Sequence, residues 1–424
     1  MSEFLIENVI DPGGVARSVG VAAGKFVDPS QLSSKAKRIA GKGRFIAPGL
    51  VDLHTHLREP GREDAETVLS GSQAAIAGGF TAISAMPNTS PIADTAGVVE
   101  QVFRLGRAHG LCEVFPIGAV TVGQAGAQLA ELIAMHQSEA RVRIFSDDGH
   151  CVWDPLIMRR ALEYVKQFDG IIAQHAQDPR LTHESQMNEG VVSSRLGLKG
   201  WPAAAEESII ARDILLADHV GSRLHICHLT TERGVELVRW GKARGIRVTA
   251  EVTPHHLLLT DELAQTYDPV YKVNPPLRTE RDVMALREGV ADGTIDIIAT
   301  DHAPHPTESK ECEWQSAAFG MVGLETALSV SFLALVKSGL MKWEELIDRM
   351  SIAPSQIAGY ANQGSLAVGD SANFLIFDPN ESWRVETSAL RSKSKNTPFA
   401  GMELPGRVVA TAFNGSFVYG EAGL

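Results

Sequence analysis

Two histidines separated by a single residue are the strongest chemical signal in the sequence. His54 and His56 stand in Asp-Leu-His-Thr-His, at the end of an apolar stretch with strand character. Because alternate side chains of a strand project from the same face, both imidazoles can point to one spot. Neutral imidazole is a preferred ligand of zinc-like divalent ions. The pair therefore indicates a metal site, or alternatively one packed ring beside one solvated ring.

Further histidines and aspartates follow other strand-like stretches. Asp301 comes directly after one of them, where on its own it could equally be a helix cap or a turn residue. His175 ends another stretch, His228 follows a third, and Asp147 and Asp148 follow a fourth. Together with the histidine pair, this is the number of ligands that a two-metal centre with a bridging carboxylate needs.

The elements that must position these groups alternate regularly along the chain. Short apolar, often β-branched runs predict eight strands: Ala47–Leu53, Thr81–Ala85, Glu113–Ile117, Val142–Phe145, Gly170–Gln174, Arg223–Cys227, Arg247–Glu251 and Asp296–Ile298. Apolar residues at every third to fourth position predict helices between them: Thr67–Ala77, Ala96–His109, Gly126–His136, Leu156–Lys166, Glu206–His219, Glu232–Arg244 and Thr279–Ala291. This alternation over roughly 300 residues favours a (β/α)8 barrel over a doubly wound open sheet. In barrel enzymes the catalytic groups lie at the carboxyl ends of the strands, where these histidines and aspartates stand.

The two ends of the chain differ from its middle. Residues 1–48 and 364–424 hold short strand-like pieces broken by glycine, and neither end is long enough to bury a core alone. We expect both ends to build one small composite β domain, with the barrel spanning residues 49–363. Arg391–Lys395 forms a short basic cluster to which the sequence assigns no role.

The composition narrows the class of protein. With 424 residues, 44% hydrophobic and 21% charged, the chain is a globular protein with a large core. Its net charge of −12 argues against a nucleic-acid binder, and no stretch predicts a secretory signal or a membrane span, so the cytoplasm is expected. The four cysteines form no closely spaced pair, so histidine and carboxylate must hold any metal.

Several longer motifs resemble the cyclic amidohydrolase superfamily, and most closely the long-chain bacterial dihydroorotases. The resemblance covers nearly the whole chain and rests on GLVDLHTHLREPG (49–61), GGFTAISAMPNTSP (78–91), FSDDG (145–149), ICHLTT (226–231), VTAEVTPHHL (248–257), NPPLR (274–278), IATDHAPH (298–305) and FGMVGLET (319–326). It implies two zinc ions per subunit. One would be held by His54, His56 and Asp301, the other by His175 and His228, with Asp148 bridging them.

Two positions separate this chain from other members of the superfamily. Hydantoinases bridge their metals with a carbamylated lysine at the end of the fourth strand, whereas residues 141–148 contain no lysine. Asp147 rivals Asp148 as the bridge, but the family places this ligand immediately before the glycine, which favours Asp148. The stretch His175-Ala176-Gln177 departs from relatives that have a cysteine and an acidic residue after the histidine. His175 itself is retained, but full occupancy of the second metal site is left open.

The resemblance implies reversible cyclisation of N-carbamoyl-L-aspartate to L-dihydroorotate and water in de novo pyrimidine biosynthesis. A hydroxide held between the metals would open the ring, with Asp301 as general acid and base. The substrate carboxylate needs a local cation, and Arg58 could grip it with a fork of two hydrogen bonds unless it is an ordinary solvated charge. The expected substrate contacts are His56, Arg58, Asn88, Asn274, His305 and the backbone at Phe319 and Gly320.

Two other functions stay open at this point. The chain could be an allantoinase or a hydantoinase-like cyclic amidohydrolase. It could also be a non-catalytic scaffold for aspartate transcarbamoylase, although such a chain should have lost metal ligands, and all six are present here. We expect a homodimer that binds neither nucleic acid nor membrane, and a complex with aspartate transcarbamoylase is a further candidate interaction.

Overall fold

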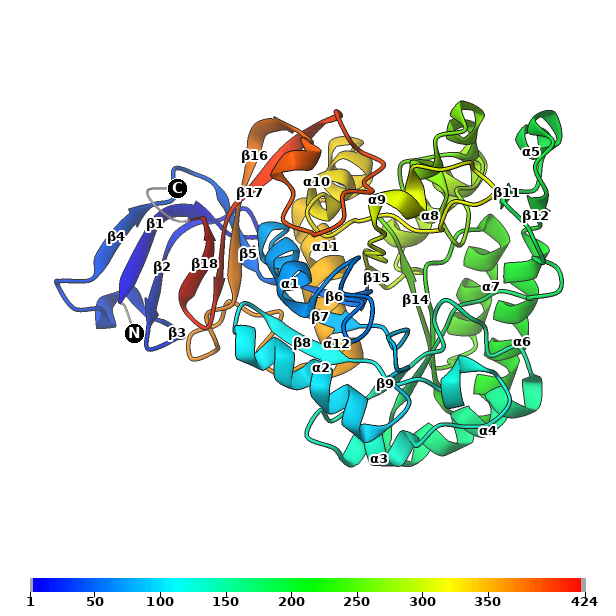
Figure 1. Ribbon diagram of the computed structural model, residues 1–424. Coiled ribbons are helices and arrows are strands. Elements are labelled where there is room, and N and C mark those ends of the chain that lie inside the picture. Colours follow the sequence, from blue (N-terminus) through cyan, green and yellow to red (C-terminus); the bar gives the residue numbers. More distant parts are fainter. Residues whose placement is uncertain (1–2, 421–424) are drawn as a thin grey trace.

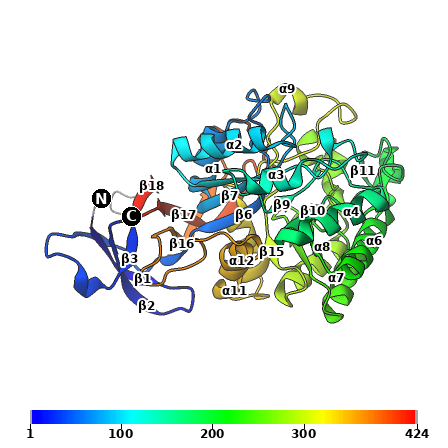
Figure 2. The ribbon, with the colours of Figure 1, turned by 90° about the horizontal axis from the view of Figure 1, so that it is seen from below.

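The structure is a computed structural model that describes residues 3–420. Eight short parallel strands form a barrel in the middle of the chain, with helices packed around it (Figures 1 and 2). In chain order they are β6 (Leu50–Thr55), β7 (Phe80–Ala85), β8 (Glu113–Pro116), β9 (Ile144–Phe145), β10 (Ile171–Gln174), β13 (Arg223–Ile226), β14 (Val248–Val252) and β15 (Ile297–Ile298). Each lies within one of the predicted strands or within two residues of it.

Two single bridges close these strands into a ring. Gly118, just after β8, pairs in parallel with Phe145 of β9. Thr55 of β6 pairs in parallel with His302, just after β15. The three-stranded and five-stranded sheets are thereby joined on both sides, which confirms the barrel and excludes the doubly wound open sheet.

Alternation along the strands divides the core into an inner and an outer part. Val51 and Leu53 of β6 belong to the cluster inside the barrel, whereas Leu50 belongs to the larger cluster under the helices. Because both faces of such strands are buried, they read as continuous apolar runs, which is the pattern that predicted them.

The helices largely follow the predicted segments. Those surrounding the barrel are α1 (Val68–Ala77), α2 (Ala96–His109), α3 (Leu132–Gln137), α4 (Pro155–Val165), α6 (Ala204–Val220), α7 (Glu232–Ala243) and α8 (Glu280–Ala291). Later in the chain come α9 (Thr307–Lys310), α10 (Ala327–Ser331), α11 (Trp343–Ile347) and α12 (Ala353–Ala358), with π-helical turns at Phe332–Lys337 and Asp348–Ile352. A small excursion holds β11 (Met187–Asn188), α5 (Val191–Leu196) and β12 (Gly200–Trp201). None of the helices described within residues 3–420 has the length and apolar character to cross a membrane.

One predicted helix is too long. Gly126–His136 is helical only from Leu132, because Leu129 pairs with Thr121 in an antiparallel bridge. The loop between them turns at Gly123 and Gly126, which adopt positive φ angles of 59° and 70°. Such angles interrupt a right-handed helix, and glycine adopts them at little cost.

Strands from both ends of the described chain meet in one sheet, seen at the left of Figure 1. Its order is β18-β17-β16-β5-β1-β2-β3, and β4 pairs in parallel with the first part of β1, which contacts β5 only at Ile10. The bounds are β1 (Phe4–Ile10), β2 (Ala16–Ala22), β3 (Lys25–Val27), β4 (Lys37–Ala40), β5 (Phe45–Pro48), β16 (Phe374–Arg384), β17 (Glu403–Phe413) and β18 (Ser416–Gly420). Phe4, Phe26 and Phe374 lie in its apolar core.

The predicted strand Ala47–Leu53 is two strands in the structure. β5 pairs with β16 in the terminal sheet, and after Gly49 the chain enters the barrel as β6. A Cβ atom on Gly49 would lie 2.1 Å from Oγ1 of Thr81, so a side chain has no room at this crossing. The apolar pattern is unbroken here because both halves are buried.

Between β16 and β17 the chain leaves the terminal sheet and runs over the barrel (Figure 1). Residues 391–397, which we call the return segment, contact the loop before α1. The Ser394 hydroxyl donates to the carbonyl of Ala65 (2.7 Å), and the backbone N–H of Lys393 donates to the Glu66 carboxylate (3.0 Å).

Candidate metal centre and substrate pocket

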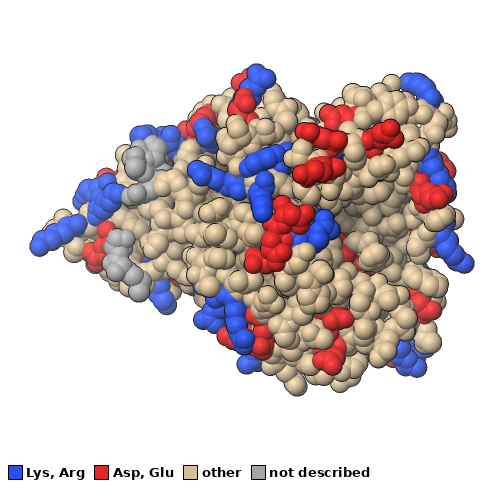
Figure 3. Space-filling view, viewed as in Figure 1, with Lys and Arg blue, Asp and Glu red and all other residues tan. Residues whose placement is uncertain are grey.

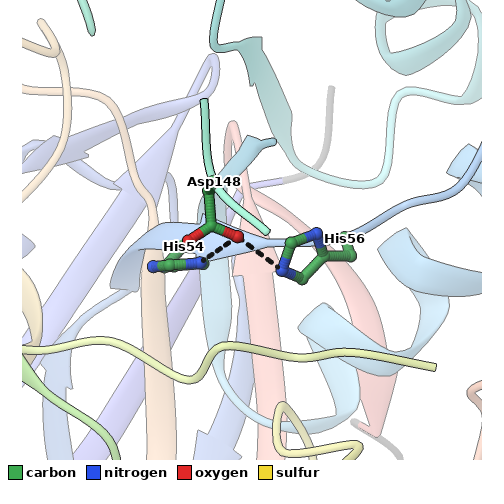
Figure 4. Close-up of side chains that lie close together, drawn as sticks. All are labelled: His54, His56 and Asp148. Carbon is green, nitrogen blue, oxygen red and sulfur yellow. Dashed lines mark ion pairs between the residues drawn. The ribbon is translucent and has the colours of Figure 1, made fainter. Parts of the chain in front are cut away.

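The carboxylate of Asp148 lies at the centre of a buried histidine cluster. Its Oδ2 is 3.3 Å from Nε2 of both His54 and His56, which project from β6 (Figure 4). Its Oδ1 is 3.1 Å from Nε2 of His228 and 3.2 Å from Nδ1 of His175. Each carboxylate oxygen thus faces one pair of histidines, which is the arrangement of a bridging ligand.

Asp301 completes the cluster on the side of His54 and His56. Its Oδ1 lies 3.0 Å from Nε2 of His56 and 3.5 Å from Nε2 of His54. Asp147, the rival of Asp148, points elsewhere and accepts the backbone N–H groups of Val120 (2.8 Å) and Thr121 (3.0 Å). The structure therefore brings all six sequence-predicted ligands together and leaves Asp147 outside.

Three residues of the site have φ angles in the left-handed region. The values are 63° for Arg58, 29° for His228 and 46° for Asp301. Non-glycine residues in this region cost on the order of 1 kcal/mol or more each, and such strain concentrates at functional sites. The surrounding barrel holds these side chains in orientations that an isolated loop would not favour.

Oxygen acceptors behind His54 and His56 set which nitrogen of each ring faces the cluster. His54 Nδ1 lies 2.5 Å from Oε1 of Glu251, and His56 Nδ1 lies 2.8 Å from Oδ1 of Asn88. Since these oxygens only accept, each Nδ1 carries the proton and each Nε2 presents its lone pair to the cluster. Asn88, an expected substrate contact, thus also orients a ligand.

Gln177 sets which nitrogen of the His175 ring faces the cluster. Its Oε1 lies 2.7 Å from His175 Nε2, so the lone pair of this ring is on Nδ1, facing Asp148. The same oxygen accepts from Nδ2 of Asn274 (3.2 Å). An amide oxygen therefore serves here in the orienting role that a carboxylate could play.

The donor set fits divalent metal ions. Five of the six ligands form two groups of three that share Asp148, and the ligand atoms of each group lie within 4.8 Å of one another. Asp301 lies beside the group that contains His54 and His56. His54 Nε2 is buried and makes no hydrogen bond with the described residues. Nδ1 of His175 and Nε2 of His228 lie 3.0 Å apart, close enough for both nitrogens to bind one cation. His54, Glu251 and Cys227 form a third group, but burial raises the pKa of the Cys227 thiol well above its usual range.

The electrostatics of the cluster also favour cations. Burial alone would lower the pKa of His54, yet the nearby carboxylates, with Asp148 first, raise it well above its usual value. Burial would likewise raise the pKa of Asp148, but the nearby His54, and after it His175 and His228, hold it well below its usual value. The pocket is therefore a negative site that binds positive charge, either protons or metal.

A cavity of about 320 Å³ opens directly on this cluster. This volume is in the usual range for sites that bind small molecules. It is lined by His56, Arg58, Asn88, Asp148, Gly149, His150, His175, Asn274, Asp301, Ala303, His305, Phe319 and Gly320. All expected substrate contacts are among these residues. A larger cavity of about 580 Å³, near β17 and β18, contains none of the six ligands.

Arg58 supplies a cation to this cavity. Its Nε donates to the carbonyl of Pro304 (3.2 Å), which leaves the Nη atoms without a hydrogen bond among the described residues. Burial, and then the neighbouring Arg62, lower the pKa of Arg58 to about 10, so the group stays charged at neutral pH. A forked donor of this kind matches a carboxylate.

The side chains of Asn274 and His305 also face the cavity, and their hydrogen-bonding roles are set by their surroundings. Asn274 Oδ1 is buried and has no hydrogen-bond partner among the described residues, so it can accept from a ligand N–H. His305 Nε2 donates to the carbonyl of Phe319 (2.7 Å). Burial, Arg58 and Lys310 lower the pKa of His305 to about 3, which keeps the ring neutral.

The backbone at Gly320 is already engaged on both sides. Its N–H donates to the carbonyl of Lys272 (3.0 Å), and its carbonyl accepts from Nζ of Lys310 (3.1 Å) and Nδ2 of Asn396 (3.2 Å). At its φ of 141°, a Cβ atom would lie 2.8 Å from Nε2 of His305. Only glycine fits this part of the wall.

Two residues behind these groups, Glu251 and Asn396, were not predicted from the sequence, and Gln177 was noted there only as a departure from relatives. A signal existed only for Glu251, a carboxylate within the otherwise largely apolar strand β14, where a buried charge needs a partner. Asn396 lies 91 positions from His305 along the chain, so only the fold reveals their contact.

The overall structure is similar to solved hydrolases of cyclic amides. It matches L-hydantoinase (dihydropyrimidinase) from Arthrobacter aurescens with a TM-score of 0.88 and 25% identity, covering 100% of this chain and 97% of the other. It also shares the fold of dihydropyrimidinase from Brevibacillus agri NCHU1002, with a TM-score of 0.84 and 20% identity over 99% and 95% of the two chains. Fold and site together define a metal-dependent cyclic amidohydrolase.

The sequence comparisons give the family within this class. Residues 43–234 match the model of the Dihydro-orotase-like family. The chain is 61% identical to a dihydroorotase of Streptomyces coelicolor over 411 residues, covering 96% of this chain and 94% of the relative. It is 53% identical to a dihydroorotase of Mycobacterium tuberculosis over 385 residues, covering 91% and 90%. The chain belongs to the dihydroorotase family, as the motifs predicted.

Proposed function

We propose that this chain is a zinc-dependent dihydroorotase that interconverts N-carbamoyl-L-aspartate and L-dihydroorotate in de novo pyrimidine biosynthesis. The observation that carries the proposal is the position of Asp148, whose two oxygens face two histidine pairs at the floor of a cavity that contains Arg58. Two metal ions at the base of the cavity would suit the hydrolysis of an amide, and the guanidinium group of Arg58 suits a substrate with a free carboxylate.

The six ligands would hold two zinc ions, one with His54, His56 and Asp301, the other with His175 and His228, and both with Asp148. When bound, zinc would supply an acidified water and polarise the carbonyl under attack. Three of the four rings, those of His54, His56 and His175, are oriented for this by their hydrogen bonds to Glu251, Asn88 and Gln177.

Asp301 is the proposed general acid and base. Its carboxylate lies at the cavity wall beside His56, within reach of both the attacking water and the ring nitrogen of a substrate above the cluster. In ring opening it would accept the proton of the water and deliver it to the departing nitrogen. In ring closure the same carboxylate would remove the proton from the ureido nitrogen.

The rest of the cavity would orient the substrate. Arg58 would grip the free carboxylate, with Asn88 and His305 beside it, and Oδ1 of Asn274 would accept a ring N–H. Hydantoin and allantoin have no carboxylate to satisfy Arg58, and residues 141–148 lack the bridging lysine of hydantoinases. Both features favour dihydroorotate over these alternatives, and the six assembled ligands disfavour a purely scaffolding role.

We further propose that the protein acts in the cytoplasm as a homodimer. On the face shown in Figure 3, basic and acidic side chains are interspersed rather than gathered into one basic surface, in keeping with a small-molecule enzyme. Binding to aspartate transcarbamoylase stays a prediction.

The test is turnover by the purified, zinc-loaded protein. L-Dihydroorotate should be hydrolysed, while hydantoin and allantoin should not. Asp301→Asn keeps the shape of the side chain but removes its basicity, and should reduce kcat by at least about 100-fold, in line with loss of a general base. Turnover of hydantoin or allantoin with none of dihydroorotate would reject the proposal.

A further inference from the structure

The return segment alternates between exposed and buried side chains. Arg391, Lys393 and Lys395 are exposed, whereas Ser392, Ser394 and Asn396 are buried against the barrel. The alternation is that of an extended chain with one face on the protein. The basic cluster noted in the sequence is therefore the solvent-exposed face of the return segment. The uncharged polar residues between the basic ones face the barrel.

Two carboxylates, the buried Glu66 and the half-buried Glu325, hold the start of this segment in place. Glu325 accepts the backbone N–H groups of Arg391 (2.8 Å) and Ser392 (3.1 Å). Glu66 accepts the N–H of Lys393 (3.0 Å) and the hydroxyl of Ser392 (2.5 Å). With backbone as well as side-chain contacts, the segment is fixed rather than loosely laid on the barrel.

Asn396 uses its whole side chain to hold the wall of the substrate cavity. Its Nδ2 donates to the carbonyls of Ala303 (3.0 Å) and Gly320 (3.2 Å), and its Oδ1 accepts the N–H of His305 (3.1 Å). These three partners line the cavity, whereas Asn396 itself does not. Its backbone carbonyl also accepts the N–H of Val322 (3.1 Å).

The three hydrogen bonds of the Asn396 side chain differ in whether their partners also bond to another group. Gly320 also accepts from Lys310, but the carbonyl of Ala303 and the N–H of His305 have no hydrogen-bond partner besides Asn396 among residues 3–420. Removing this amide would leave two backbone groups at the cavity wall without protein partners, and the chain would shift to satisfy them. Both groups lie in the stretch that carries His305.

We propose that Asn396 is a positioning residue for substrate binding, and that the segment returning from the terminal sheet thereby completes the pocket of the barrel. The inference rests on the proposed function in that it treats His305 and Gly320 as substrate contacts. Asn396 acts through them and touches neither the metal ligands nor the substrate.

Substitution should therefore change substrate affinity more than chemistry. For Asn396→Ala we expect a KM for dihydroorotate that is 10- to 100-fold higher, with kcat within about 3-fold of the parent and an unchanged zinc content. Asn396→Asp should keep the bond to His305 but direct a carboxylate oxygen at two carbonyls. At lower pH the introduced carboxyl group is protonated and can donate a hydrogen bond to one of these carbonyls. The ratio of the variant's KM to that of the parent should therefore fall as the pH is lowered.

Ser394→Ala is the matched control. Ser394 is as buried as Asn396, lies two residues before it, and donates to Ala65 (2.7 Å), which is not part of the cavity. A purely structural role for the return segment would give both variants the same loss of stability and the same kinetics. A parent-like KM in Asn396→Ala, or an equal rise in Ser394→Ala, would overturn the inference.

A second readout separates this inference from the proposed substrate. If the parent protein does not turn over dihydroorotate, the proposed function fails, but crystal structures of the parent and Asn396→Ala in one crystal form still test Asn396. We expect His305 and the peptide between Phe319 and Gly320 to be displaced in the variant. Unchanged positions would overturn the inference whatever the substrate.

Discussion

Replacing Glu251 by glutamine should weaken metal binding although all six proposed metal ligands are retained. Oε1 of Glu251 lies 2.5 Å from Nδ1 of His54 and accepts the N–H of His228 (3.2 Å), while Oε2 lies 3.0 Å from Nε2 of His225. Glutamine has the same shape but only one acceptor oxygen. Its NH2 group would therefore face either His54 Nδ1 and the N–H of His228, or Nε2 of His225, whose proton would then have to move to Nδ1.

The size of the effect follows from these contacts. A hydrogen bond to a charged group contributes about 1.5–3 kcal/mol, compared with about 1 kcal/mol for a neutral one. Loss of the charge at His54 alone should cost about 0.5–2 kcal/mol, or about 2- to 30-fold in affinity. The misplaced NH2 group adds to this, so we expect zinc to bind 10- to 100-fold more weakly, as is typical for partners of metal ligands.

The assay is zinc binding in competition with a chelator, followed by turnover at graded free zinc. Glu251→Gln should need 10- to 100-fold more zinc for half-maximal activity and recover most of its kcat at saturation. Asp52→Asn is the control, because burial raises the pKa of this carboxyl to about 7 and it contacts only the backbone of His54 and Thr300. Parent-like zinc affinity in Glu251→Gln, or an equal loss in Asp52→Asn, would refute the reasoning.

Three further substitutions have defined outcomes. Arg58→Lys removes the forked donor, so steady-state kinetics should show a KM for dihydroorotate about 10- to 100-fold higher, and an unchanged KM would contradict the role of Arg58. Gln177→Ala leaves His175 Nε2 without its acceptor, so metal titration should show one of two zinc ions bound about 10-fold more weakly, and equal loss of both would count against it. Burial raises the pKa of Glu325 from 4.5 to about 7, so between these values the folded state holds a proton that the unfolded chain has released, and stability falls as the pH rises. Glu325→Gln removes this dependence, so its Tm minus that of the parent should increase between pH 5 and pH 8, and a constant difference would refute the assignment.

The barrel was predictable because its strands are buried on both faces and therefore stand out as apolar runs between amphipathic helices. The same property hid the junction at Gly49, where two buried strands of different sheets follow each other without a polar break. The start of α3 was misplaced because its preceding loop contains apolar residues at helical spacing, and the positive φ angles of Gly123 and Gly126 are not visible in that pattern.

The candidate site was predictable to the extent that its groups follow strand ends. His54, His175 and Asp301 do so directly, and their assembly is a consequence of closing the barrel. The groups behind them are fixed by contacts across long separations, 197 positions for His54 and Glu251 and 91 for His305 and Asn396. Apart from the carboxylate of Glu251 in a largely apolar strand, no local pattern marks such partners, because any buried acceptor of the right reach could fill the role.

The central claim is that Asp148 bridges two metal ions between two histidine pairs. Anomalous diffraction from crystals of the zinc-loaded protein measures this directly. The account predicts two peaks, one among His54, His56 and Asp301 and one between His175 and His228, both in contact with the Asp148 carboxylate. A single peak at full zinc loading, or peaks that do not contact Asp148, would contradict it.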